Sequence, residues 1–177
     1  PDDTLHVGYL ENQGVYYKSR SVDGVWSYPE TIFTGYVYHL ESTMDDFGIF
    51  YLTWRSAGEI SYAERSPSGQ WSSTIRINVD DGVYVHEIVT DNNRAYILWY
   101  GTEGLKFRYQ FEDNTWSSII NLSSGHITNE LDFSVSDDHV QAIWAQGEDW
   151  NTRDLVFSEW DIPQTVFGSL TQTITLP

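Results

Sequence analysis

The chain repeats one short pattern at a fixed spacing. A Trp-Ser pair begins at Trp26, Trp71 and Trp116, so successive pairs lie 45 residues apart. A second aromatic series has the same spacing and comprises Tyr9, Trp54, Trp99 and Trp144. Two series with one period indicate that the chain is built from equivalent structural units of about 45 residues.

Each unit has the pattern of four short β-strands. Its most apolar segment is a run of β-branched and aromatic residues, which is typical of a strand. These runs are "IFYLTW" (49–54), "AYILWY" (95–100) and "VQAIWA" (140–145). In the second unit the four strands are expected at 38–44, 49–55, 60–65 and 71–77. No helical periodicity of useful length appears, so the pattern is that of a β-propeller blade.

The sequence therefore predicts an all-β fold, a β-propeller of about four four-stranded antiparallel blades in one domain, 1–177. The blades are expected at about 1–33, 34–78, 79–123 and 124–177. The repeated Trp is expected to pack between blades, because a lone sheet cannot bury both of its faces. The pattern leaves open whether the ring is small and closed or part of a larger ring, which is either completed by a homo-oligomer or cut from a longer chain.

Two blades depart from the repeat. The first lacks the segment for its first strand, and the tail "LTQTITLP" (170–177) alternates like a strand that could supply it and close the ring. The last carries an insertion, "GEDWNTRD" (147–154), between its second and third strands.

Composition narrows the class of partner. Lys and Arg total 9 and Asp and Glu total 26, which gives a net charge of −17. Such a surface repels phosphate backbones and anionic membranes, and leaves cations and neutral ligands such as sugars. The absence of Cys excludes disulfides and thiolate metal sites. No run of 18 apolar residues is present, so no membrane insertion is expected.

The first residue bears on localisation. The chain begins with Pro1 rather than Met, which is typical of a processed or excised product. This favours an extracellular or cell-surface location.

The turns before each Trp-Ser pair carry a family resemblance. They are "SVDGVW" (21–26), "SPSGQW" (66–71) and "FEDNTW" (111–116). With "GIFYLTWRSAGEISYAERSPSGQWSS" (48–73), they resemble the repeat of sialidase-type propellers, in which an Asp-box, Ser-x-Asp-x-Gly-x-x-Trp, joins two strands. These turns are shorter than the Asp-box, and only the first keeps Ser, Asp, Gly and Trp together. The resemblance covers nearly the whole chain and implies the scaffold, not the chemistry.

The sequence does not match the catalytic residues that the resemblance would imply. Sialidases of this type use three arginines, a Tyr/Glu nucleophile pair, an acidic residue and an Arg-Ile-Pro signature on six blades. Here Arg76 and Ile77 are followed by Asn78. Arg20 and Arg65 share one repeat position with Gln110 and Trp160, so they are not a converging set. We predict no catalytic residues, and a sialidase-type glycoside hydrolase or a fragment of one stays as the alternative.

Polar residues on the expected first strands are the first candidate group, because these strands line the channel of a propeller. They are His39, Glu41, His86, Glu87, Glu130 and Asp132. Imidazoles and carboxylates can hold a divalent cation or act as acid and base. No ligand spacing of a known metal motif is present, so we interpret them as hydrated channel groups and predict no metal or cofactor.

Acidic turns are the second group. They are Asp45-Asp46, Asp80-Asp81, Asp91-Asn92-Asn93 and Asp137-Asp138. Asx side chains bond to their own turns, which explains the periodicity without a ligand. Calcium at these turns is the less favoured alternative.

The third group consists of residues that could form a sugar-binding site between blades. Sugars stack on aromatic rings and offer hydroxyls to charged groups. The candidate ligand-binding residues are Arg20, Arg65, Tyr100, Trp150 and Trp160. Trp150 and Trp160 lie outside both Trp series, and the alternative interpretation of Trp150 is a cap on the fourth blade. The favoured function is a secreted or cell-surface module that recognises a glycan or a protein without catalysis. A purely structural or protein-interaction propeller is the other alternative.

Overall fold

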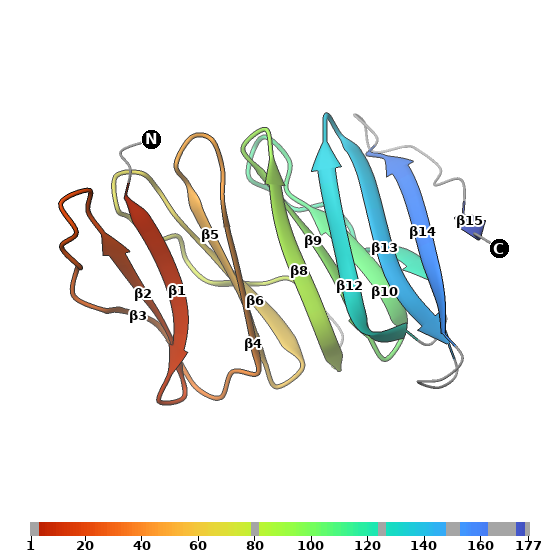
Figure 1. Cartoon of the computed structure of the whole chain (residues 1–177), viewed down its shortest axis with the longest axis horizontal. Helices are drawn as coiled ribbons and strands as arrows, with labels where there is room; N and C mark the ends of the chain where they lie inside the picture. The colour runs from red at the N-terminus through yellow and green to blue at the C-terminus, as the bar shows by residue number, and fades with distance from the viewer. Residues whose placement is uncertain (1–3, 79–81, 124–126, 148–152, 163–172, 176–177) are drawn as a thin grey trace. The chain divides into compact units, whose positions relative to one another are not determined.

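The computed structural model describes residues 4–78, 82–123, 127–147, 153–162 and 173–175. Their regular structure is entirely β, arranged as four antiparallel sheets, and this confirms the all-β prediction (Figure 1). The chain forms two compact units, Pro1–Val83 and Tyr84–Pro177.

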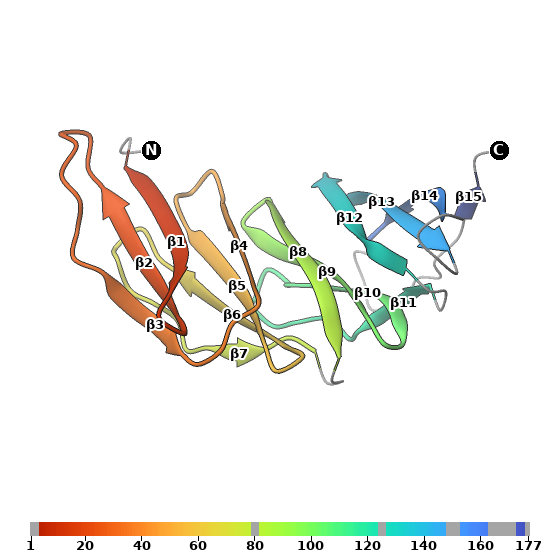
Figure 2. The ribbon, with the colours of Figure 1, turned by 60° about the horizontal axis from the view of Figure 1, so that its bottom comes forward.

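The first unit holds two sheets (Figures 1 and 2). The first sheet has the order β1 (Leu5–Glu11), β2 (Gly14–Arg20), β3 (Glu30–Thr34). The second sheet has the order β4 (His39–Met44), β5 (Phe50–Ser56), β6 (Glu59–Arg65), β7 (Ile75–Arg76). The described part of the first sheet has three strands, as the missing segment predicts.

The second unit holds the third and fourth sheets. The third sheet has the order β8 (Val83–Asp91), β9 (Arg94–Gly101), β10 (Gly104–Tyr109), β11 (Ile120–Ser123). The fourth sheet has the order β12 (Ile127–Ser136), β13 (His139–Gly147), β14 (Arg153–Asp161), β15 (Thr173–Thr175).

The tail strand belongs to the fourth sheet. β15 pairs antiparallel with β14, and Phe157 lies opposite Ile174. The expectation that the tail completes the first sheet is therefore wrong. The outer edge of β14 would otherwise present unpaired backbone groups, and the tail strand satisfies them within its own sheet. The insertion partly extends the hairpin, because Gly147 pairs with Arg153.

The Trp-Ser pairs share one hydrogen-bond arrangement. Each Trp forms an isolated bridge with the residue six positions earlier. The hydroxyl of each following serine accepts a bond from the backbone N–H eight positions earlier, and donates to the next carbonyl. The accepting bonds are Ser19 N to Ser27 Oγ at 3.0 Å, Glu64 N to Ser72 Oγ at 3.1 Å and Tyr109 N to Ser117 Oγ at 3.1 Å. The serine thus extends the sheet where backbone pairing is interrupted.

The turn before each pair also repeats. Its fourth residue has a positive φ, which is +80° at Gly24, +91° at Gly69 and +63° at Asn114. In the second repeat, Ser66 Oγ accepts a bond from Gln70 N at 3.1 Å. In the third repeat Phe111 has no hydroxyl, and the Asp113 carboxylate instead accepts a bond from Thr115 N at 3.0 Å. Glycine and asparagine fit this turn because they tolerate the left-handed backbone.

Each sheet has one face that carries the aromatic series. We call it the tryptophan face and define it by Phe50, Leu52 and Trp54 and by the residues at the same positions in other repeats. In the second sheet these three side chains are buried in a cluster with Val15 and Tyr17 of the first sheet. A Cβ at position 8 would lie 2.6 Å from Leu52 Cδ1, so Gly8 permits this close approach. Trp54 of the aromatic series therefore packs between the first and second sheets, as the repeat predicts.

The second unit packs in the same way. Val140, Ala142 and Trp144 are the tryptophan-face residues of the fourth sheet. They are buried in a cluster with Leu98 and Phe107 of the third sheet. We call the opposite face of each sheet the reverse face: the reverse face of the first sheet receives the tryptophan face of the second, and the reverse face of the third sheet receives that of the fourth.

Candidate functional site

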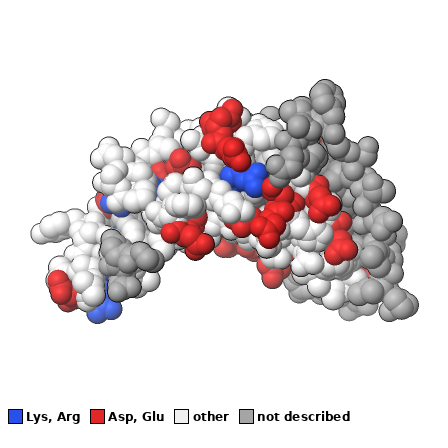
Figure 3. Space-filling view, turned by 90° about the horizontal axis from the view of Figure 1, so that it is seen from above, with Lys and Arg blue, Asp and Glu red and all other residues white. Residues whose placement is uncertain are grey.

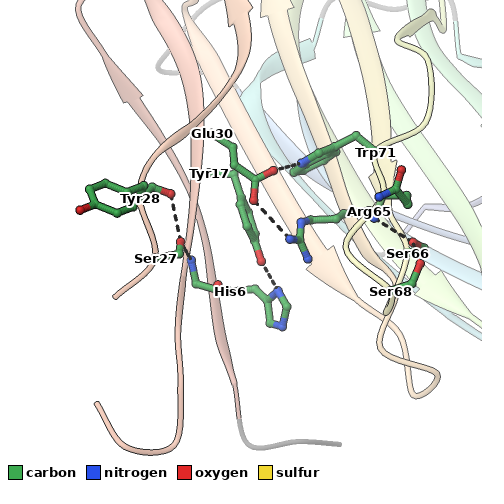
Figure 4. Close-up of polar contacts among 11 residues, drawn as sticks. His6, Tyr17, Ser27, Tyr28, Glu30, Arg65, Ser66, Ser68 and Trp71 are labelled. Carbon is green, nitrogen blue, oxygen red and sulfur yellow. Dashed lines mark hydrogen bonds and ion pairs between the residues drawn. The ribbon is translucent and has the colours of Figure 1, made fainter. Parts of the chain in front are cut away.

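Arg65, an expected ligand residue, joins the first two sheets (Figure 4). Its guanidinium carbon lies 4.6 Å from the ring centroid of Tyr17. Arg65 Nη2 lies 3.2 Å from Glu30 Oε1, and Trp71 Nε1 donates to Glu30 Oε2 at 2.9 Å. The Tyr17 hydroxyl in turn lies 2.7 Å from His6 Nδ1. Through these contacts, the Arg65 side chain packs between the first two sheets.

Two further expected residues lie in the interior. Trp160 is buried and meets Phe107 edge-on, with ring centroids 5.4 Å apart at 85°. Tyr100 is buried beside Tyr84, at 5.5 Å between centroids. Neither offers surface to a ligand, because both lie on faces that pack within the second unit. Arg20 is exposed, and its Nε donates to Gly24 O at 3.2 Å.

Trp150 lies outside the described residues, as do Asp80 and Asp81. The structure therefore does not place these three expected site residues.

The channel residues differ in exposure. His86 is fully buried. Glu87 is half-buried, and Asp132 is exposed. Glu130 lies on β12, but its side chain is outside the described set.

His39 and Glu41 form a pair on β4, which is the edge strand of the second sheet. His39 Nε2 lies 3.0 Å from Glu41 Oε1, and both side chains are about one-third exposed. They are two residues apart on one strand, so they share a face. Across the ladder His39 lies opposite Arg55 of β5.

Exposed aromatic residues adjoin this pair. Tyr36 and Tyr38, just before β4, are 64 % and 63 % exposed. The Arg55 guanidinium carbon lies 5.4 Å from the Tyr38 ring centroid, within the range of a cation–π contact. Tyr38 N donates to Arg55 O at 3.0 Å, which holds the two residues together.

We call these five residues, Tyr36, Tyr38, His39, Glu41 and Arg55, the β4 edge cluster. Arg55 Nη1 donates to Val83 O at 3.0 Å, which fixes the guanidinium. Partial burial lowers the pKa of Arg55, and the nearby Tyr38 opposes this shift. An arginine titrates so far above neutrality that it stays charged there. The cluster therefore combines aromatic surface, a fixed cation and a carboxylate.

Sequence reasoning found His39 and Glu41 but not the other three members. The segment "GYVYHLE" (35–41) contained the missing signal. Tyr36 and Tyr38 lie outside the 45-residue aromatic series, which was the argument applied to Trp150. Arg55 required the strand register, because it is 14 residues from Glu41 and 16 from His39 in the chain.

The acidic side chains of these turns accept hydrogen bonds from backbone and side-chain groups, either in their own turn or in the turn of a neighbouring sheet. Asp45 Oδ1 accepts bonds from Phe47 N and Ile49 N, both at 2.9 Å, and Asp45 Oδ2 accepts one from the Tyr51 hydroxyl at 2.7 Å. In the second unit Asp91 Oδ2 accepts a bond from Asp137 N at 3.0 Å. Among the residues that the structure describes, no group of three His, Asp or Glu side chains is placed to hold a metal ion.

The surface is strongly acidic, and Asp and Glu side chains outnumber Lys and Arg on the face in Figure 3. In the described part of the chain, no helix combines the length and apolar character needed to cross a bilayer.

Comparison with known proteins gives no sequence match: neither a family model nor a curated protein matches the chain. Solved structures do match. A protein of unknown function from Dyadobacter fermentans aligns with a TM-score of 0.64 at 11 % identity, over 90 % of this chain and 50 % of its own. The phage phi92 endosialidase aligns with a TM-score of 0.58 at 10 % identity, over 86 % of this chain and 29 % of its own.

A third similar structure is the xylan β-1,4-xylosidase of Bacillus halodurans. It aligns with a TM-score of 0.53 at 12 % identity, over 93 % of this chain and 39 % of its own. The fold is a β-propeller. At these identities the likeness shows the fold alone, and the chain spans half or less of the length of these three proteins.

Proposed function

We propose that this propeller is a non-catalytic, glycan-binding module that contacts its ligand through the β4 edge cluster. The observation that carries the proposal is the exposure of Tyr38 beside a fixed guanidinium and a His39–Glu41 pair, with exposed Tyr36 two residues before it in the chain. Sugars present apolar faces that stack on aromatic rings, and hydroxyls that bond to charged side chains. The cluster offers both kinds of contact on one strand edge.

The chemistry of the cluster favours binding over hydrolysis. Most glycosidases use two carboxyl groups, about 5–5.5 Å apart in retaining enzymes and about 6.5–9.5 Å apart in inverting enzymes. The β4 edge cluster contains one carboxylate, Glu41, and this carboxylate is already paired with His39. The alternative function is that of a sialidase-type glycoside hydrolase, and an activity assay tests it.

The similar structures support a carbohydrate ligand. Two of them are named as an endosialidase and a xylosidase, both of which act on glycans. The repeated turn before each Trp-Ser pair supports the sialidase-like repeat family as part of the same proposal. The proposed glycan-binding function includes an extracellular or cell-surface location, because glycans are displayed there.

A glycan array probed with the purified chain, with and without calcium, tests the proposal. We expect specific binding in both conditions, since the cluster needs no metal ion. The bound glycan is then incubated with the chain and analysed for products. A blank array would contradict glycan recognition and favour a structural or protein-interaction role, whereas release of product would contradict the non-catalytic assignment.

A further inference from the structure

The tryptophan face differs between the first sheet and the other three. The three side chains that define it are buried in the second, third and fourth sheets. In the first sheet the same positions are Leu5, Val7 and Tyr9, and Leu5 is 53 % exposed while the other two are half-buried. Trp26, which corresponds to Trp71, is 48 % exposed. Within the first unit, no described sheet covers the tryptophan face of the first sheet.

This face is hollow. Val7, Tyr9, Leu10, Glu11, Lys18 and Trp26 line a depression of about 570 Å³. Tyr9 stacks on Tyr16, with centroids 5.7 Å apart at 28°. Charged residues at such positions do not prevent burial, since Lys106 of the third sheet is buried and pairs with Glu103 at 2.7 Å.

The fourth sheet shows the complementary exception on its reverse face. Leu98 and Leu105 on the reverse face of the third sheet are fully buried. The corresponding residues of the fourth sheet are Ile143 and Leu155, which are 37 % and 58 % exposed. In the first and third sheets, the corresponding reverse face packs against the tryptophan face of another sheet.

We propose that the tryptophan face of the first sheet binds the reverse face of the fourth sheet of a second copy of this chain. The first-to-second and third-to-fourth sheet contacts provide the template for this interface, because both join a reverse face to a tryptophan face. The interface is heterologous: each copy contributes a different surface. This inference is independent of the proposed glycan site.

Charge favours the same pairing. Lys18 and Arg20 are two of only 9 basic residues, and both lie on the tryptophan face of the first sheet. Glu159 lies beside Phe157 on β14, and its carboxylate is partly exposed. Lys18 and Arg20 attract Glu159 of the partner face, whereas the net charge of −17 repels copies that approach without this alignment.

A complementation experiment tests the proposal. Tyr9→Glu damages the first-sheet face, and Leu155→Glu damages the fourth-sheet face. We expect the native chain to show a concentration-dependent mass above 20.4 kDa by light scattering after gel filtration. Each variant alone should remain at the monomer mass. A 1:1 mixture should recover association, because the intact face of each variant fits the intact face of the other.

Controls keep the test decisive. Phe47→Glu changes a phenylalanine that is 68 % exposed in the turn between β4 and β5 of the second sheet, outside both faces, so this variant should associate as the native chain does. Leu5→Glu replaces Tyr9→Glu if the latter lowers the urea midpoint. A native chain that stays monomeric at all concentrations would overturn the proposal and leave a sheet from another polypeptide as the occupant. A mixture of folded variants that fails to associate would also overturn it.

Discussion

The guanidinium carbon of Arg65 lies 4.6 Å from the ring centroid of Tyr17, so a cation of the second sheet covers an aromatic ring of the first. In the second unit, Trp160 occupies the equivalent position and meets Phe107 at 5.4 Å. One repeat position thus joins neighbouring sheets by two different aromatic contacts. Arg65 is a stabilising residue of the scaffold.

Arg65→Met should lower the free energy of unfolding by about 1–2 kcal/mol, because a partly desolvated cation–π contact is worth about that much. The ion pair with partly exposed Glu30 adds little. Urea unfolding in dilute solution measures the change. Arg20→Met is the matched control, since Arg20 holds the same position on an exposed face, and its effect should stay within about 0.5 kcal/mol. Equal losses in the two variants would contradict the assigned role.

Ser117→Ala should destabilise the chain by about 1–3 kcal/mol, because it leaves the buried Tyr109 N–H without its side-chain acceptor. The neighbouring Ser118 is exposed, and Ser118→Ala should be close to neutral. Thermal unfolding of both variants measures the difference. If the two serines prove interchangeable, the Trp-Ser hydroxyl is not a structural element of the repeat.

His139 should titrate above its usual range. Its Nδ1 lies 2.8 Å from Asp161 Oδ1, and this hydrogen bond, aided by the charges of Asp161 and Glu159, raises the pKa of His139 although desolvation opposes the shift. A raised folded-state pKa stabilises the chain fully below the unfolded value of about 6.5, and this contribution is lost as the pH rises through the folded value.

Nuclear magnetic resonance titration of the His139 ring measures that pKa directly. Asp161→Asn removes the charged acceptor and should bring the pKa down toward 6.5. A native His139 that titrates at or below 6.5 would rule out the ion pair in solution.

The strands were predictable because alternation and repetition are local signals. The strand expected at 49–55 is Phe50–Ser56, and the one expected at 60–65 is Glu59–Arg65. The strand expected at 71–77 is only Ile75–Arg76, because the Trp-Ser serine replaces part of its backbone ladder. The tail strand was assigned to the wrong sheet, since alternation alone does not say which edge a strand satisfies.

The site was less predictable because it depends on which face of a strand meets a neighbour. Tyr100 alternates in step with Tyr96 and Leu98, and all three are buried. Trp160 is outside the Trp series, yet it occupies the Arg65 position and is buried for that reason. Tyr36 and Tyr38 became visible as candidates only from their exposure.

Glycan affinity of Tyr38→Ala, compared with Tyr28→Ala, tests the central claim most directly. Both residues are exposed tyrosines of the first unit, but only Tyr38 belongs to the β4 edge cluster. Calorimetric titration with the glycan found on the array should show a loss for Tyr38→Ala of about tenfold, which is about 1.4 kcal/mol, and no loss for Tyr28→Ala. Unchanged affinity in Tyr38→Ala, or an equal loss in both variants, would contradict glycan recognition by this cluster.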